Sequence, residues 1–348
     1  MPASKGYAAL NAHSPLGPHA FSRREPGPSE VLIDILYCGV CHSDLHMTRN
    51  EWGNAVYPMV PGHEIVGRVI QVGTSSKKFQ AGDLAAVGVI VDSCRHCAPC
   101  NRGEEHFCDE GATLTYAATD RVDGSITMGG YASNYVVDER FAHTVPANLD
   151  LAAVAPLLCA GITTYSPLRH WNAGPGKKVG IIGLGGLGHM GLKFSHSFGA
   201  HTVQFTTNER KREDALRLGA DEVIFSKDPA QMKAHAASFN FILDCVSAPH
   251  SLDDYLPLLK QDGTIALVGL PDKPPSFAPF NLIRIRRSIA GSMIGGMVET
   301  QQMLDYCGQH NITSDVEVIP IGKVNEAFER LLRQDVKYRF VIDMSTLK

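Results

Sequence analysis

Val179-Gly-Ile-Ile-Gly-Leu-Gly-Gly-Leu-Gly188 is the stretch that decides the fold of this chain. Its apolar beginning, Val179–Ile182, has the character of a buried strand and leads directly into a glycine-rich turn. In that turn Gly183 permits the tight bend, Gly185 admits a pyrophosphate and Gly188 lets a helix pack on the strand. The N-terminus of the helix would then face the phosphates, so the stretch predicts a dinucleotide-binding turn.

The alternation of strand and helix continues after this turn. Helical segments such as Leu187–Phe198 and Arg212–Leu218 separate apolar strand runs. The runs are Val179–Ile182, Thr202–Thr206, Glu222–Phe225, Phe241–Cys245 and Thr264–Leu267. This spacing predicts a parallel, doubly wound α/β sheet.

The first part of the chain has a different pattern, in which short β-rich runs are separated by glycines. The runs are Val31–Leu36, Ile65–Val72, Leu84–Val91 and Tyr135–Val137. They predict a compact β barrel with a cysteine-rich lobe inserted at about Asp92 to Cys108. Leu151–Trp171 lacks alternation and is expected to be helical.

The last part of the chain contains an amphipathic segment, Val324–Arg333, and a strand run, Tyr338–Ile342. The most economical place for this final strand is back on the β-rich domain. That domain is therefore predicted to be discontinuous.

Length and composition describe an ordinary globular protein. The 348 residues suggest about two domains, and 44% are hydrophobic and 20% charged. Lys and Arg number 32 against 36 Asp and Glu, with no basic stripe, so we expect no nucleic-acid partner. The N-terminus has no apolar signal segment, and no apolar run reaches the ~18 residues of a membrane span. With nine clustered cysteines read as metal ligands rather than disulfides, we expect a soluble, cytoplasmic protein without a membrane partner.

Cys94, Cys97, Cys100 and Cys108 form the pattern C-x2-C-x2-C-x7-C. Three thiolates on one tight loop, closed by a fourth, give a tetrahedral set without a vacant position. The pattern favours a structural zinc ion over the alternatives, a disulfide pair or an iron–sulfur cluster.

A second group of metal ligands is indicated by Cys41-His-Ser-Asp-Leu-His46, directly after the first strand run. Its companions would be His63, which lies next to a carboxylate, and Cys159, at an apolar helix start. One imidazole and two thiolates bind Zn²⁺ with a fourth position open for water or a substrate oxygen. Taken singly, Cys159 is more often a buried small apolar residue and His63 more often structural.

Four motifs now stand in order: Gly39-Val-Cys41-His-Ser43-Asp44, Gly62-His63-Glu64, the four-cysteine lobe and Gly183-Leu-Gly-Gly-Leu-Gly188. Over essentially its whole length the chain resembles the zinc-dependent medium-chain alcohol dehydrogenases. Tyr57-Pro-Met-Val-Pro-Gly-His-Glu64 and Gly291-Ser-Met-Ile-Gly-Gly296 resemble the cinnamyl-alcohol-dehydrogenase-like branch, which includes bacterial broad-range aldehyde reductases.

The resemblance implies a role for each residue of the second metal group. Cys41, His63 and Cys159 would be the ligands of a catalytic zinc, which makes two zinc ions per chain. Glu64 would be an alternate carboxylate ligand, and Asp44 would hydrogen-bond the His63 ring and fix its tautomer.

The resemblance also implies a proton relay. Ser43 would pass the alcohol proton through the nicotinamide ribose to His46 at the surface. Zinc lowers the pKa of a bound alcohol, so that it can release hydride near neutral pH, and it polarises an aldehyde in the reverse direction. The alternatives are that Ser43 only caps a helix and that His46 only lies in solvent.

The end of the second strand of the parallel sheet indicates which nucleotide is bound. Thr206-Thr-Asn-Glu-Arg-Lys-Arg212 offers hydroxyls, an amide and then cations, which suit a 2′-phosphate. In the branch that the chain resembles, NADP-preferring enzymes have small hydroxyl residues and a lysine here; Glu209 would instead bind a free ribose hydroxyl. We therefore expect NADP(H), held by Gly183, Gly185, Gly186, Leu187, Gly188, Thr206, Thr207, Asn208, Lys211 and Thr163.

The resemblance implies an architecture as well. Residues 1–154 and 292–348 would form a GroES-like catalytic domain, residues 155–291 a Rossmann domain, and the cleft between them would hold the catalytic zinc. Trp52, Met293 and Ile294 would line the substrate pocket. Relatives form dimers through an edge strand, here expected at Ala290–Ile294, so we expect a homodimer.

The expected function is the interconversion of primary alcohols and aldehydes, aromatic and medium aliphatic, over a broad range. High cellular NADPH would favour aldehyde reduction. Two alternatives stay open: a reductase of conjugated C=C or iminium bonds, and a non-catalytic protein that binds NADPH or zinc.

Overall fold

The computed structural model describes residues 1–271 and 273–347, and the chain forms two compact units. Unit 1 comprises Met1–Cys159 and Gly295–Lys348, and unit 2 comprises Ala160–Ile294. The predicted domain boundaries at 154 and 291 lie a few residues before these divisions. Because the first division follows Cys159, this residue lies in the same unit as Cys41 and His63, whereas the predicted boundary placed it in the other domain.

Unit 1 is built on a seven-stranded sheet with the order β16-β17-β3-β4-β5-β9, and β8 pairs with β3 off this path. The strands are β3 (Glu30–Val40), β4 (Ile65–Val72), β5 (Leu84–Val87), β8 (Asn134–Asp138), β9 (His143–Thr144), β16 (Val316–Pro320) and β17 (Arg339–Asp343). Two small sheets pair β1 (Ala3–Ala8) with β2 (Gly17–Ser22), and β6 (Ile90–Asp92) with β7 (Thr113–Leu114).

The helices of unit 1 are α1 (His42–Thr48), α2 (Ala98–Asn101), α3 (Leu151–Val154), α9 (Met297–His310) and α10 (Val324–Leu332). The amphipathic segment predicted near the C-terminus is α10, which buries Val324, Ala327, Phe328 and Leu331. Apolar residues at this spacing lie on one face of a helix, and in α10 that face is the buried one.

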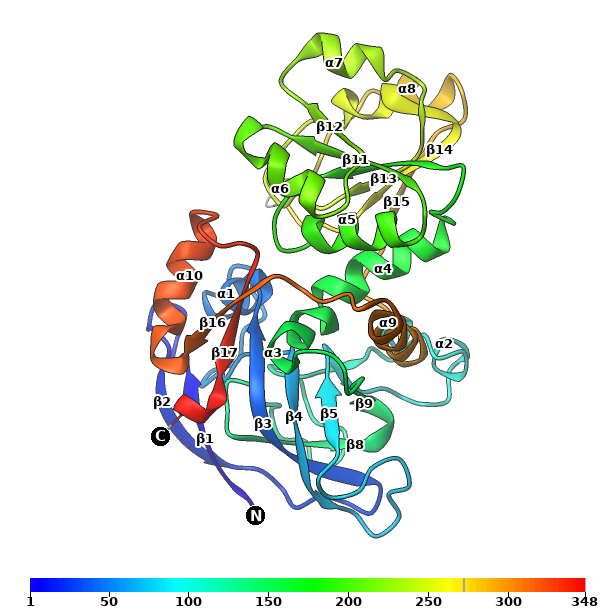
Figure 1. Cartoon of the computed structure of the whole chain (residues 1–348). Coiled ribbons are helices and arrows are strands. Elements are labelled where there is room, and N and C mark those ends of the chain that lie inside the picture. Colours follow the sequence, from blue (N-terminus) through cyan, green and yellow to red (C-terminus); the bar gives the residue numbers. More distant parts are fainter. Residues whose placement is uncertain (272, 348) are drawn as a thin grey trace. The chain divides into compact units, whose positions relative to one another are not determined.

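The last strand of the chain joins the strand that leads to Cys41. β17 pairs antiparallel with β3, and Phe340 lies opposite Val40. Figure 1 shows β17, in red, beside β3, in blue. The predicted return of the C-terminal strand to the first domain is confirmed, and it brings the side chains of β17 close to the end of β3.

One predicted run is wrong. Leu84–Val91 is two strands that belong to different sheets, because β5 ends at Val87 and β6 begins at Ile90. Gly88 lies in the break, where a Cβ atom would approach the carbonyl oxygen of Leu158 at 3.2 Å. Both strands are apolar and mostly buried, so composition alone does not reveal the break.

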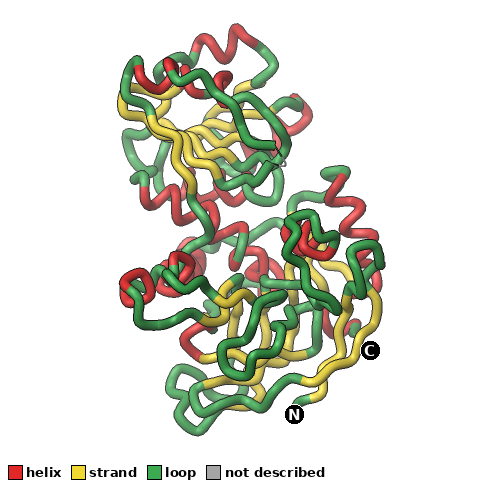
Figure 2. The backbone as a smooth tube through the Cα atoms, turned by 180° about the vertical axis from the view of Figure 1, so that it is seen from behind, coloured by secondary structure: helices red, strands yellow, loops and turns green. Residues whose placement is uncertain are grey.

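Unit 2 has a six-stranded parallel sheet with the order β12-β11-β10-β13-β14-β15. The strands are β10 (Lys178–Ile182), β11 (His201–Thr206), β12 (Glu222–Phe225), β13 (Phe239–Asp244), β14 (Leu259–Leu267) and β15 (Ser288–Gly291). The helices are α4 (Ala160–His170), α5 (Gly188–Ser197), α6 (Arg212–Arg217), α7 (Pro229–Ala234) and α8 (Phe280–Ile283). Figure 2 shows these strands in yellow with helices around them.

The strand order of unit 2 defines where a ligand can bind. β11 and β12 follow on one side of β10 and β13 to β15 on the other, so the order in which strands are added reverses at β10. In open parallel sheets ligands bind at such a switch point. The predicted fold class, a β-rich domain with a doubly wound parallel-sheet domain, is confirmed.

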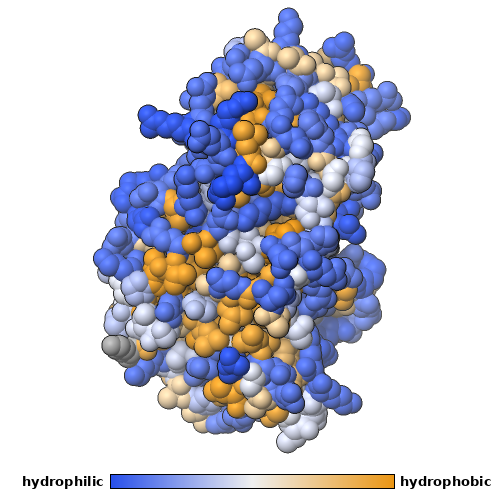
Figure 3. Space-filling view, viewed as in Figure 1, coloured by the Kyte–Doolittle hydropathy of each residue, from blue (hydrophilic) through white to orange (hydrophobic). Residues whose placement is uncertain are grey.

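The segment Leu151–Trp171 is helical in three pieces, because a 3-10 helix (Ala155–Leu158) and a break at Cys159 separate α3 from α4. No single helix among the described residues is long and apolar enough to cross a membrane. Leu151–Leu158 and Ala160–His170 reach the length only as a bent pair. The face seen in Figure 3 is largely hydrophilic, with apolar side chains in smaller groups.

Candidate functional site

The first turn of α1 positions Cys41. β3 ends at Val40, and Cys41, in an extended conformation, is the N-cap of α1. The Asp44 carboxylate, three residues further on, accepts a hydrogen bond from the Cys41 N–H at 2.9 Å. A side chain at this position of a helix satisfies a donor that would otherwise lack a partner. Local sequence therefore fixes the geometry of the Cys41 turn.

Three separate segments bring potential metal ligands together in unit 1. Single ligand atoms of Cys41, His63, Glu64 and Cys159 all lie within 4.8 Å of one another. The Sγ atoms of Cys41 and Cys159 are 3.9 Å apart. Apart from Cys41, which is partly exposed, these residues are buried.

The thiols of Cys41 and Cys159 and the imidazole of His63 all have strongly shifted pKa values. The hydrogen bond with Cys159 lowers the pKa of Cys41 well below its usual range, although burial acts in the opposite direction. The same bond raises the pKa of Cys159. Burial lowers the pKa of His63, but the neighbouring Asp44 carboxylate raises it further, so that it lies well above its usual value. Two thiolates and one imidazole with this spacing fit Zn²⁺ and leave a position for a further ligand.

Asp44 connects the two parts of this group. Its Oδ1 accepts from the Gly62 N–H and from Nδ1 of His63, both at 3.0 Å. Its Oδ2 accepts from the Cys41 N–H and, at 3.1 Å, from the hydroxyl of Tyr131. The carboxylate is fully buried. Because Nδ1 of His63 is held by Asp44, the other ring nitrogen is free to bind a metal.

Glu64 is held by a residue that sequence reasoning missed. Arg339, on β17, forms an ion pair with Oε1 of Glu64 and donates to the carbonyl oxygen of Val40 at 3.0 Å. Glu64 Oε2 is buried without a hydrogen-bond partner among the described residues. Burial raises the pKa of Glu64 to about 7, and the Arg339 guanidinium acts against that rise. The signal that could have revealed Arg339 is a charge within the otherwise apolar run Tyr338–Ile342.

The carboxylate of Glu64 fits only because residue 39 has no side chain. A Cβ atom on Gly39 would lie 1.8 Å from Glu64 Oε2. Close packing against Glu64 therefore explains why residue 39, two residues before Cys41, is a glycine.

Ser43 and His46 lie one helical turn apart on α1. Cys41, not Ser43, is the N-cap of this helix, so Ser43 is free of the capping role that was its alternative. The Sγ of Cys41 lies 3.6 Å from Ser43 Oγ. His46, with 21% of its side chain exposed, contacts the Glu51 carboxylate through Nδ1. This leaves Nε2 as the nitrogen of His46 that can exchange a proton.

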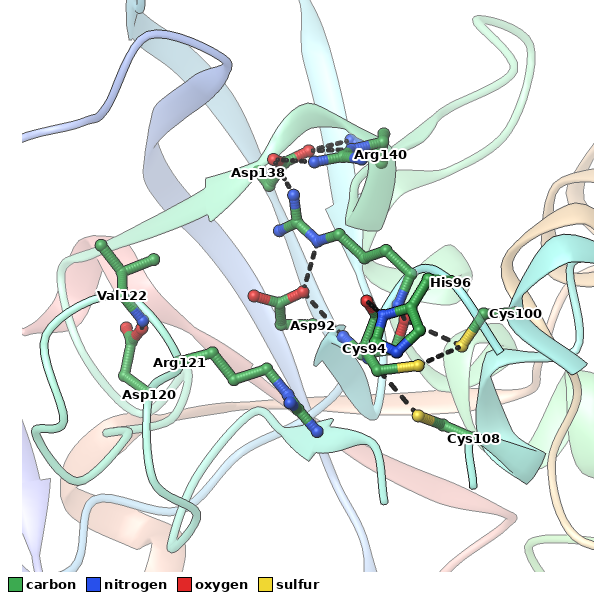
Figure 4. Close-up of polar contacts among 12 residues, drawn as sticks. Asp92, Cys94, His96, Cys100, Cys108, Asp120, Arg121, Val122, Asp138 and Arg140 are labelled. Atoms are coloured by element: carbon green, nitrogen blue, oxygen red, sulfur yellow. Dashed lines mark hydrogen bonds and ion pairs between the residues drawn. The ribbon is translucent and has the colours of Figure 1, made fainter. Parts of the chain in front are cut away.

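The four-cysteine lobe brings its thiols within 4.8 Å of one another. Cys94 Sγ lies 3.8 Å from Cys100 Sγ and accepts from the Cys97 N–H at 3.3 Å, while Cys108 Sγ accepts from the Cys94 N–H at 3.4 Å. Figure 4 shows Cys94 pointing toward Cys100 and Cys108. Backbone donors directed at sulfur favour thiolates, which are the form that binds zinc.

The glycine-rich turn of unit 2 has the geometry of a phosphate-binding loop. Gly183 has a φ of +85°, which a residue with a side chain rarely adopts. A Cβ atom on Gly188 would lie 1.9 Å from the carbonyl oxygen of Gly183, whereas one on Gly185 would meet nothing within 4 Å. The turn is thus closely packed at both ends and open in the middle, directly before α5.

The other residues predicted to bind the nucleotide lie in the same unit, and Gly186 and Leu187 complete the turn itself. Lys211 reaches across the turn and donates from Nζ to the carbonyl oxygen of Leu184 at 2.9 Å; its pKa is lowered by burial. Thr206 is buried at the end of β11, and Thr207 and Asn208 are exposed after it.

One of the predicted nucleotide residues has a role within the fold, and another is buried. The Asn208 side chain accepts from the Arg210 N–H at 3.0 Å and so caps a short 3-10 helix (Glu209–Lys211). Thr163 is buried in α4. Their part in cofactor binding stays a prediction.

The predicted pocket residues belong to different units. Trp52 follows α1 in unit 1, is 43% exposed and has its ring centroid 5.4 Å from that of His46. Met293, which is 56% exposed, and Ile294 end unit 2. The substrate pocket inferred from them stays a prediction.

Comparison with known proteins gives matches along the chain. Residues 27–147 match the model of the alcohol dehydrogenase GroES-like domain, and residues 186–308 match that of the zinc-binding dehydrogenases. An aldehyde reductase of Escherichia coli, YahK, is 58% identical over 345 residues, which cover 99% of each chain.

Solved structures agree with this result. A cinnamyl alcohol dehydrogenase from Sorghum bicolor is 45% identical, has a TM-score of 0.96, and is matched over 99% of its length by 100% of this chain. A cinnamyl-alcohol-dehydrogenase structure from Helicobacter pylori, in complex with NADP(H), is 42% identical with a TM-score of 0.93 and 99% coverage of both chains.

The buried Arg339–Glu64 pair leads to a prediction about stability. Replacing Arg339 with Met leaves the Glu64 carboxylate buried without its cation. We expect the free energy of unfolding in urea, measured on metal-free protein, to fall by about 3–5 kcal/mol.

Arg330→Met is the matched control, because Arg330 pairs with Glu317 in a solvent-accessible position. The decrease in the free energy of unfolding caused by Arg330→Met should be clearly smaller than that caused by Arg339→Met. Equal losses for the two variants would contradict the importance assigned to the buried pair.

Proposed function

This chain belongs to the zinc-dependent alcohol dehydrogenase family, and from that premise we propose that it reduces a broad range of aromatic and medium aliphatic aldehydes to primary alcohols. Its class of activity is the zinc-dependent interconversion of alcohols and aldehydes with NADP(H), which it shares with relatives at up to 58% identity over 99% of the chain. High cellular NADPH is the reason for proposing the direction of reduction. The physical basis lies in the residues that hold the metal, the proton path and the nucleotide.

The observation that carries the proposal is the group Cys41, His63 and Cys159, whose ligand atoms lie close together in a largely buried position. These three residues would hold the catalytic zinc. A zinc ion bound there lowers the pKa of an alcohol ligand and polarises a carbonyl group. Asp44 holds His63 in the tautomer that donates from Nδ1, so Nε2 is presented to the metal.

Glu64 is the fourth member of the group and its free Oε2 supports a role as an alternate ligand. The four thiols of Cys94, Cys97, Cys100 and Cys108 would hold a second zinc ion. Their set has no vacant position, so this ion would stabilise the lobe and take no part in the reaction.

Ser43 and His46 would move the proton. The Ser43 hydroxyl, next to Cys41 Sγ, would accept the alcohol proton during oxidation while it gives up its own toward His46 by way of the nicotinamide ribose, and these transfers would reverse during reduction. His46 exchanges that proton with solvent at Nε2, because Glu51 engages its Nδ1.

The nucleotide would be NADP(H). The open middle of the Gly183–Gly188 turn supports binding of the pyrophosphate, and the hydroxyl of Thr207 and the ammonium of Lys211 support binding of a 2′-phosphate. When bound, this cofactor supplies or accepts the hydride. The cytoplasm, where free thiols persist, is the location that we propose.

We also propose a homodimer formed through the free edge of β15, the last strand of the unit 2 sheet. The segment just before β15 exposes large apolar side chains: Phe277 is 40% exposed, Phe280 67% and Ile283 73%. Apolar side chains beside an unpaired strand edge favour association with a second copy.

Activity should depend on the metal and on the choice of cofactor. Oxidation of NADPH with benzaldehyde or cinnamaldehyde should stop after chelation and return with Zn²⁺, and NADPH should be clearly preferred to NADH. Lys211→Ala should reduce that preference about 10-fold or more, because a charge-assisted bond to the phosphate is lost.

Lys233→Ala, an exposed lysine on α7, is the control for charge and should keep the preference. Preference for NADH in the unchanged protein would favour Glu209 as the residue that binds the ribose. Normal metal content without turnover of any aldehyde or alcohol would favour reduction of C=C or iminium bonds, or a non-catalytic role.

A substitution at Ser43 tests the proton relay. Ser43→Ala should lower kcat for alcohol oxidation about 100-fold or more, since proton transfer loses its first acceptor. Thr48→Val removes a hydroxyl from the same helix, where it bonds only the Leu45 carbonyl among the contacts described, and should leave kcat unchanged. Full alcohol oxidation by Ser43→Ala would show that the relay is wrongly assigned.

Sedimentation velocity tests the proposed dimer. The unchanged protein should sediment as a dimer, and Phe280→Ser with Ile283→Ser should shift it toward monomer because apolar contact area is lost. Leu332→Ser, which removes an exposed apolar side chain from α10, should not. A monomer in the unchanged protein at micromolar concentration would rule out the edge-strand dimer.

A further inference from the structure

The segment Gly129-Gly130-Tyr131 lies directly against the residues that precede His63. The Gly129 N–H donates to the Val60 carbonyl at 2.6 Å, and the Tyr131 N–H donates to the Pro61 carbonyl at 2.9 Å. The Gly130 N–H donates to the Gly62 carbonyl at 2.8 Å. Three successive backbone hydrogen bonds fix the path of the chain up to His63.

This close approach depends on glycines. A Cβ atom on Gly129 would lie 2.4 Å from the Pro61 carbonyl oxygen. A Cβ atom on Gly62 would lie 2.6 Å from the ring of Tyr131. The Tyr131 ring therefore packs on bare backbone immediately before His63.

The hydroxyl of Tyr131 completes the contact. The side chain is fully buried and donates to Oδ2 of Asp44 at 3.1 Å, while Oδ1 of the same carboxylate accepts from Nδ1 of His63. Without this hydroxyl, Oδ2 would keep the Cys41 N–H, and the Tyr116 hydroxyl is a further hydrogen-bonding neighbour of the Asp44 carboxylate. A carboxylate that accepts two hydrogen bonds at each oxygen is held in one orientation more firmly than a carboxylate that has lost one of these donors.

We propose that Tyr131 is a positioning residue of the zinc site: its ring fixes the backbone before His63 and its hydroxyl fixes the Asp44 carboxylate that orients the His63 ring. Among the contacts described for it, the Tyr131 side chain bonds Asp44 and not a ligand atom of Cys41, His63 or Cys159. It acts through Asp44, and the inference rests on the proposed binding of zinc by Cys41, His63 and Cys159.

The test compares Tyr131→Phe with Tyr135→Phe. Both tyrosines are buried in unit 1, but the Tyr135 hydroxyl donates at 2.8 Å to the carbonyl of Thr115, away from Asp44. Zinc affinity is measured by competition with a chromophoric chelator, and the ligand field by the visible spectrum of the Co²⁺-substituted protein.

Tyr131→Phe should bind the zinc held by Cys41, His63 and Cys159 about 10-fold less tightly. Its Co²⁺ spectrum should also change, since the hydrogen-bond partners of metal ligands contribute at least this much to affinity. Tyr135→Phe should match the unchanged protein in both. The zinc held by the four-cysteine lobe serves as internal reference and should be the same in all three proteins.

A double-mutant cycle with Asp44→Asn separates orientation from general stability. If Tyr131 acts through Asp44, adding Tyr131→Phe to Asp44→Asn should cause no further loss of zinc affinity. Additive losses, unchanged affinity in Tyr131→Phe, or failure of only this variant to fold without metal would each overturn the proposal. If the unchanged protein held no zinc beyond that of the four-cysteine lobe, the proposed zinc site itself would fail, which is a separate result.

Discussion

The buried carboxylate of Asp44 is the interaction on which the candidate metal site depends. It accepts hydrogen bonds from the backbone of Cys41 and of Gly62, from the ring of His63 and from the hydroxyl of Tyr131. A buried charge is costly unless several donors satisfy it, so moving any one of these donors away would cost free energy. In this way one side chain joins the end of β3 to the start of β4 and makes two distant ligands into one site.

Unit 2 rests on the opposite kind of constraint, the absence of side chains. Gly183 has a backbone conformation that other residues avoid, and the start of α5 approaches its carbonyl because residue 188 has no Cβ. The middle of the turn stays open, at the carboxyl end of β10 where the strand order reverses. Packing at both ends and space between them are what a bound pyrophosphate requires.

Prediction from sequence succeeded where chemistry and spacing coincide within a short stretch. The four cysteines of the lobe, the glycine turn and the strands of the parallel sheet are of this kind, because local patterns fix local structure. It was wrong for Leu84–Val91, where both strands are apolar and only their partners in different sheets separate them. Arg339 and Tyr131 were missed for a related reason: each acts on a residue far away in the chain. The charge of Arg339 within an apolar run shows that it needs a partner but not which one, and nothing in the neighbourhood of Tyr131 marks it.

The sequence by itself determined the fold class, the two sets of candidate metal ligands and the kind of nucleotide turn, because ligand type and spacing are properties of the chain. Only the tertiary structure decided which groups surround those ligands. The pairing of β17 with β3 brings Arg339 to Glu64, and the approach of Gly129 and Gly130 to Pro61 and Gly62 brings Tyr131 to Asp44. Burial of charge makes such partners necessary, but strand pairing and close packing decide which residues they are.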